Sequence, residues 1–97
     1  MPLIETHTFR LAEGADVGGF LDADKRVQTE LMLTKPTFLR RTTARGGDGE
    51  WLVIVLWSSE GDADISSAHF GDHPANATFM AFVDEATVMS RRYETLD

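Results

Sequence analysis

The segment Trp51–Trp57 constrains the fold more than any other part of the chain, because all seven of its residues are apolar. Successive side chains of a strand point to opposite faces of a sheet, so a strand of this composition needs cover on both faces. A more polar segment, residues 37–45, precedes it, and the connecting residues 46–49 include three glycines. The two segments are therefore predicted to form a hairpin, with the second strand inside a sheet and the first at its edge.

Periodicity and capping residues predict the other elements. Alternation of threonine and apolar residues favours a strand over residues 3–11. Asp16 is a good N-cap for an amphipathic helix, which must end before Pro36. A second helical region begins after Ser58, restarts at Pro74 and extends to residue 86 on its apolar stripe. Residues 88–95 are predicted to form the last strand.

The order strand, helix, strand, strand, helix, strand predicts an α+β fold of the ferredoxin-like βαββαβ type. In this fold the helices cover one face of a four-stranded antiparallel sheet. We expect residues 1–97 to form a single domain. The uncovered face would expose an apolar patch that is rare on a monomer. We therefore expect a homodimer, in which two sheets pair to form a dimeric α/β barrel.

Composition excludes several classes of partner. The formal net charge of −7 argues against nucleic acid and anionic membranes, which both require a positive surface. The chain has no cysteine, so disulfides and thiolate chemistry are excluded. No basic leader precedes a long apolar run at the start of the sequence. We expect a cytoplasmic protein that binds neither nucleic acid nor membranes.

Three segments, residues 35–41, 48–57 and 73–80, together with the element order, resemble the dimeric α/β-barrel superfamily and within it the antibiotic biosynthesis monooxygenase type. The resemblance implies the ferredoxin-like fold, a homodimer and chemistry that needs no cofactor. It extends to cofactor-free monooxygenases, heme-degrading enzymes, isomerases and stress-responsive proteins. Trp57 matches the tryptophan that ends the third strand of monooxygenase members. Val53 stands where those members have an asparagine.

Five residues are candidates for a site in the barrel. His7, beside Glu5, is a candidate general base near neutral pH. Trp51 and Trp57 are candidates for the wall of an aromatic pocket. One arginine of each adjacent pair on the edge strands should point inward, and we select Arg40 to bind an anionic or phenolate group. The last candidate is Tyr93, which would donate a hydrogen bond into the cavity. For each residue the structural alternative is core packing, an edge charge or the dimer seam.

His69 and His73 have the spacing of two helical metal ligands, but Gly71 and Pro74 interrupt the helix, so no metal site is predicted. These patterns favour a cofactor-independent monooxygenase or isomerase acting on a small aromatic or polyketide-like substrate. The alternative is a barrel protein that binds a small apolar ligand without chemistry or serves a stress response.

Overall fold

Four strands form one antiparallel sheet in the order β2-β3-β1-β4. The computed structural model describes residues 2–32, 38–70 and 73–96. The elements along the chain are β1 (Leu3–Leu11), α1 (Val17–Arg26), η1 (Val27–Leu31), β2 (Phe38–Arg45), β3 (Trp51–Trp57), α2 (Glu60–Phe70), α3 (Pro74–Met80) and β4 (Val83–Glu94). This is the expected α+β, ferredoxin-like arrangement, with β1 and β3 inside the sheet and β2 and β4 at its edges.

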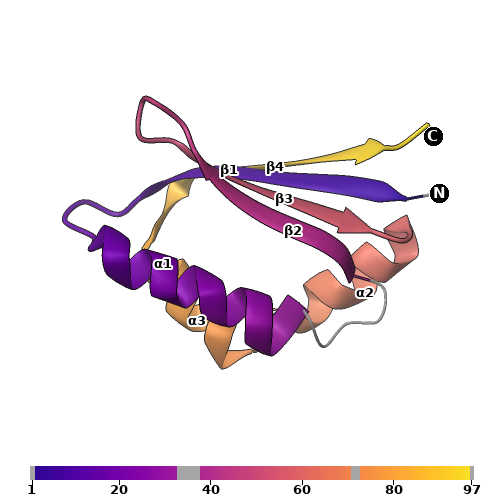
Figure 1. Cartoon of the computed structure of the whole chain (residues 1–97), viewed down its shortest axis with the longest axis horizontal. Helices are drawn as coiled ribbons and strands as arrows, with labels where there is room; N and C mark the ends of the chain where they lie inside the picture. Colours follow the sequence, from indigo (N-terminus) through magenta and orange to yellow (C-terminus); the bar gives the residue numbers. More distant parts are fainter. Residues whose placement is uncertain (1, 33–37, 71–72, 97) are drawn as a thin grey trace.

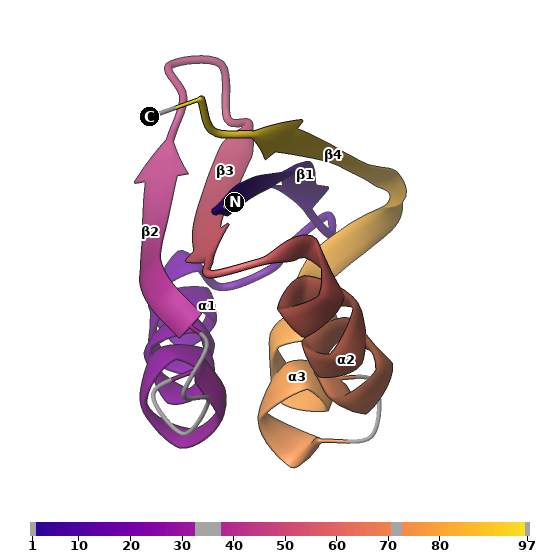
Figure 2. The same cartoon turned by 90° about the vertical axis from the view of Figure 1, so that its right-hand side faces the viewer.

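All helices lie on the same side of the sheet (Figures 1 and 2). We call the sheet face toward them the inner face and the opposite face the outer face. The alternating burial of β3 places both tryptophans on the inner face, where Trp57 is fully buried and Trp51 is nearly so. The helices of the same chain therefore cover the indoles, and this face needs no second copy.

Aromatic rings connect the helices to the inner face. Phe20 of α1 lies 4.9 Å from Trp51 and 5.3 Å from Phe79 of α3, measured between ring centroids. Phe9 of β1 packs edge-on against both phenylalanines at 5.8–5.9 Å. Tilted and edge-on pairs at these distances stabilise a core beyond the effect of apolar burial alone. The cluster fixes α1 and α3 relative to the sheet.

The capping predictions for both helical regions are confirmed. The Asp16 side chain accepts a hydrogen bond from the Gly19 amide, and Pro74 is the first residue of α3. The predicted extension of that helix to residue 86 is wrong, because α3 ends at Met80 and β4 begins at Val83. Val83 pairs with Leu11 in the sheet, which gives its backbone partners that a longer helix would remove. Pro36 lies outside the described residues.

Two local irregularities, one in the first helix and one in the β2–β3 pairing, depart from regular geometry. The first helix continues as a π-helix over Val27–Leu31, which the sequence analysis did not predict. The register between β2 and β3 shifts between Phe38 and Arg40. Phe38 therefore faces the same side as Arg41, and not the side of Arg40 as strict alternation predicts.

The outer face carries the apolar residues of β3 that the helices do not cover. It includes Leu52, Ile54 and Leu56, which are half-buried. A shallow groove of about 350 Å³ on this face is lined by Ile4, Arg40, Thr42, Ile54 and Leu56. No helix in the described part of the chain is long and apolar enough to cross a membrane.

Candidate functional site

A cavity of about 160 Å³ lies between the inner face and the helices. We call it the inner cavity. It is lined by His7 and Phe9 of β1, Val27 of η1, Met32, Arg41 of β2, Val53 and Val55 of β3, Asn76, Phe79 and Met80 of α3, and Val88 of β4. All but three of these side chains are apolar. The exceptions, His7, Arg41 and Asn76, supply the polar chemistry of the site.

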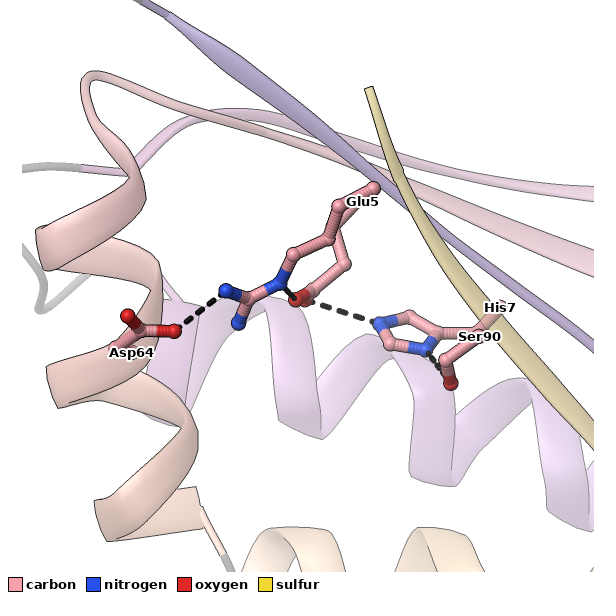
Figure 3. Close-up of polar contacts among 5 residues, drawn as sticks. Glu5, His7, Asp64 and Ser90 are labelled. Carbon is pink, nitrogen blue, oxygen red and sulfur yellow. Dashed lines mark hydrogen bonds and ion pairs between the residues drawn. The ribbon is translucent and has the colours of Figure 1, made fainter. Parts of the chain in front are cut away.

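His7 is held at both ring nitrogens (Figure 3). Its Nε2 atom lies 3.0 Å from a Glu5 carboxylate oxygen, and its Nδ1 atom lies 2.7 Å from the Ser90 hydroxyl of β4. Glu5 precedes His7 by two residues on the same face of β1, and the β1–β4 register places Ser90 directly opposite His7. The strands thus fix the imidazole from two sides.

Glu5 is a buried carboxylate with two cationic or donor partners. It is only 5% exposed, and its second oxygen accepts a hydrogen bond from Arg92 Nε at 3.1 Å. Arg92 also pairs with Asp64 of α2, which links the helix to the sheet. Burial alone would raise the pKa of Glu5, but the hydrogen bonds and charges of His7 and Arg92 outweigh it and lower that pKa. Glu5 is therefore ionised at neutral pH.

The charge on Glu5 determines which nitrogen of His7 is basic. An ionised carboxylate has no proton to donate, so the hydrogen of this contact must lie on His7 Nε2. In the neutral imidazole the free electron pair is then on Nδ1, where it accepts the hydroxyl proton of Ser90. Proton uptake at Nδ1 creates an imidazolium ion that the Glu5 carboxylate stabilises.

Arg41, and not Arg40, is the arginine of this pair that lines the inner cavity. Its side chain is 5% exposed and pairs with Asp24 of α1 at 2.7 Å. The Thr43 hydroxyl donates to the same Asp24 oxygen at 2.8 Å. The Arg41 guanidinium also lies 5.8 Å from the centre of the Phe79 ring. Helix α1 and strand β2 therefore hold a buried cation at the cavity.

The other predicted site residues lie elsewhere. Trp51 and Trp57 pack in the core and do not line the inner cavity. Arg40 and Tyr93 lie on the outer face, because they pair with Leu56 and Ile4 across the sheet. The structure therefore does not bring the five candidates together, and only His7 reaches the inner cavity.

Of the two histidines with metal-ligand spacing, the structure describes only the side chain of His73. His73 uses its Nδ1 atom to accept a hydrogen bond from the Ala75 amide at the start of α3. The side chain of His69 lies outside the described part. No group of three or more metal-binding side chains occurs among the residues that the structure describes.

Arg92 belongs to an edge-strand arginine pair of which one member was expected to point inward, but Asp64, Ser90 and Asn76 were not among the predicted site residues. The partners of Arg92 come from β1 and α2, which are distant in the sequence. The alternation of β4 places Ser90 and Arg92 on the same face, but it does not indicate which residues of β1 and α2 they contact. Asn76 follows the helix start at Pro74, and no pattern indicated the cavity beside it.

Comparison with known proteins finds matches to the fold but none to the sequence. No family model matches the sequence, and no curated protein does either. Solved structures match over nearly the whole chain. SnoaB, a cofactor-independent oxygenase from Streptomyces nogalater, is 16% identical, with a TM-score of 0.81 over 99% of this chain and 94% of that chain. This chain has the same fold.

Two further structures agree with this assignment. A conserved protein from Methanosarcina mazei is 11% identical, with a TM-score of 0.79 over 97% of this chain and 92% of its own. A candidate antibiotic biosynthesis monooxygenase from Caulobacter crescentus is 12% identical, with a TM-score of 0.78 over 99% and 91%. The fold expected from the resemblance to antibiotic biosynthesis monooxygenases is thus confirmed. At these identities the likeness concerns the fold alone.

Proposed function

We propose that the chain is a cofactor-independent oxygenase that acts on a small aromatic or enolisable molecule in the inner cavity. The observation that carries the proposal is His7, whose Nε2 atom is bound to a buried, ionised Glu5 while its ring lines the cavity. This arrangement provides a general base next to an apolar pocket. The oxygenase with the same fold supports the choice of reaction.

The proposed reaction begins with proton transfer. An activated C–H or O–H group of the substrate loses its proton to His7 Nδ1, once the Ser90 hydroxyl turns away from that atom. The resulting carbanion or phenolate supplies electrons to molecular oxygen. For a methylene group the balanced change is CH₂ plus O₂ to C=O plus H₂O, with one oxygen atom in each product. Glu5 stabilises the imidazolium that forms.

The volume of the inner cavity limits the size of the substrate. An apolar cavity of about 150 Å³ in another protein takes up benzene. The inner cavity, at about 160 Å³, therefore suits a single substituted ring. A polycyclic substrate would require the helices to move away from the inner face.

We also propose that two copies pair through their outer faces. Leu52, Ile54 and Leu56 form a row of half-buried apolar residues there, continuous with Ile4 of β1. Burial of this row by a second sheet would remove apolar surface from water and close the shallow outer groove. Under this proposal Arg40 and Tyr93 would lie between the two sheets. Sedimentation equilibrium at micromolar concentration tests the dimer, and a stable monomer would overturn it.

Oxygen consumption tests the proposed reaction. The assay uses single-ring activated phenols, with anthrone as a polycyclic comparison, a chelator, and matched reactions without protein. We expect faster uptake with protein, and a loss of about 10²–10⁴-fold in His7→Gln, which is the usual contribution of a general base. Thr8→Val, on the outer face of the same strand, is the matched control and should retain activity. Uptake no faster than in buffer across this panel would overturn the oxygenase, and binding without uptake would favour a non-catalytic ligand-binding protein.

A further inference from the structure

The guanidinium of Arg41 has more hydrogen-bond donors than its own chain uses. Among the described residues, its single hydrogen-bond partner is Asp24, which accepts from Nη2. A guanidinium presents five N–H donors, and the Arg41 side chain is 95% buried because only 5% of it is exposed. The donors that Asp24 does not use are therefore available to an oxygen atom of a ligand in the cavity that Arg41 lines.

Asn76 presents a second unused polar group to the same cavity. It belongs to the first turn of α3 and is half-buried. Within the part of the chain that the structure describes, its side-chain amide makes no hydrogen bond, although its backbone N–H bonds to the His73 carbonyl. An amide group of this kind offers two donors to a ligand.

Phe79 places the two groups close together. Arg41 lies over its ring, and Phe79 follows Asn76 by three residues on α3. Side chains three residues apart on a helix are neighbours, with roughly 5–6 Å between their Cβ atoms. Arg41 and Asn76 therefore reach into the same part of the cavity, from β2 and α3 respectively. His7 reaches the cavity from β1, on the other side of β3.

We propose that Arg41 and Asn76 together bind an acceptor oxygen, a carbonyl or an ionised hydroxyl, of an otherwise apolar ligand. That this ligand is a substrate rests on the proposed function, but its binding can be measured without turnover. The site orients the molecule, since its oxygen lies toward β2 and α3 while the opposite end lies toward His7. The negative charge that develops on the substrate oxygen after proton loss is then stabilised by a cation already in place.

Two probes of matched shape test this site. Acetophenone carries a carbonyl oxygen, and isopropylbenzene has nearly the same shape without an acceptor. Their dissociation constants are measured by NMR titration without substrate turnover. We expect acetophenone to bind at least about tenfold more tightly, since a hydrogen bond from a charged donor has this effect on affinity. Equal affinities for the wild-type protein would overturn the proposal.

Variants assign the preference to the two residues. Asn76→Leu removes the amide without leaving a partner unpaired, so it should fold normally and reduce the preference several-fold. Arg41→Met should abolish the preference, with circular dichroism as a check on folding. Arg40→Met, on the outer face, is the matched control and should keep the wild-type ratio. A preference that survives in Asn76→Leu and in folded Arg41→Met would overturn the site.

The outcome is independent of the oxygenase assay. If the carbonyl preference depends on both residues but oxygen uptake is absent, the proposed function fails and the oxygen site stands. If uptake occurs but the probes bind equally, the oxygen site fails and the oxygenase stands.

Discussion

Replacement of Glu5 by glutamine tests the charged hydrogen bonds of Glu5 in the candidate site. The carboxylate accepts hydrogen bonds from His7 at 3.0 Å and from Arg92 at 3.1 Å. A hydrogen bond to a charged group contributes about 1.5–3 kcal/mol. Glutamine keeps one acceptor but turns an NH₂ group toward the other donor. His7 and Arg92 are each about one-third exposed, so water replaces part of the loss.

We therefore expect Glu5→Gln to lower the free energy of unfolding by about 2 kcal/mol at pH 7. For a domain of this size the melting temperature would fall by about 8–16 °C. The effect should depend on pH with a definite sign. The folded protein lowers the pKa of Glu5 below its ordinary value of 4.5, so the folded state binds this proton less readily than the unfolded state. The stabilisation is present above about pH 4.5 and is lost as the pH falls through the lower, folded-state pKa.

Urea unfolding of both proteins between pH 7 and pH 3 measures this difference. The gap in the free energy of unfolding between wild type and Glu5→Gln should be largest near pH 7 and should narrow on acidification. Glu30→Gln is the control, because Glu30 forms an exposed pair with Arg26 and should change stability far less. A gap below about 0.5 kcal/mol at pH 7, the range of ordinary surface substitutions, would refute the reasoning. A gap that stays constant with pH would refute it as well.

Two further predictions concern His7 and the outer face. Ser90→Ala removes the hydroxyl that occupies His7 Nδ1, so carbethoxylation of His7 by diethyl pyrocarbonate should become several-fold faster, as followed by peptide mass spectrometry. An unchanged rate would show that Ser90 does not cover this nitrogen, and Ser58→Ala is the matched control. Ile54→Lys places a charge in the centre of the outer face and should convert the proposed dimer to monomer in sedimentation experiments, with the helical circular dichroism signal retained. A dimer that persists in Ile54→Lys would place the interface elsewhere.

The sheet could be predicted from the sequence because its strongest signals are local. A strand that is apolar at every position must lie inside a sheet, and Trp51–Trp57 does so. Asp16 marked the start of α1 for the same reason, since an N-cap acts within one turn of its helix. The end of α3 was missed because Val83 fits a helical stripe and a strand equally well. The sheet partner Leu11 decides between them.

Less of the candidate site than of the fold could be predicted from the sequence. Alternation showed that Arg40 and Arg41 point to opposite faces, but it did not show which face the helices cover. The hydrogen bond between His7 and Ser90 depends on the β1–β4 register, which contains a shift between Thr8 and Arg10. Asn76 meets the cavity from a helix of seven residues, where the packing of α3 against the sheet decides its direction.

The π-helix η1 makes the width of the inner cavity depend on a single residue. A π-helix bonds each amide to the carbonyl five residues back, one more than an α-helix does. Val27 and Met32 lie at the two ends of this wider turn, and both line the cavity. A one-residue deletion within Val27–Leu31 would restore regular α-helical winding, so Val27 and Met32 would stand four residues apart on the same side of the helix around a narrower turn. A single-codon deletion is thus enough to narrow this wall of the pocket while the strands keep their pairing.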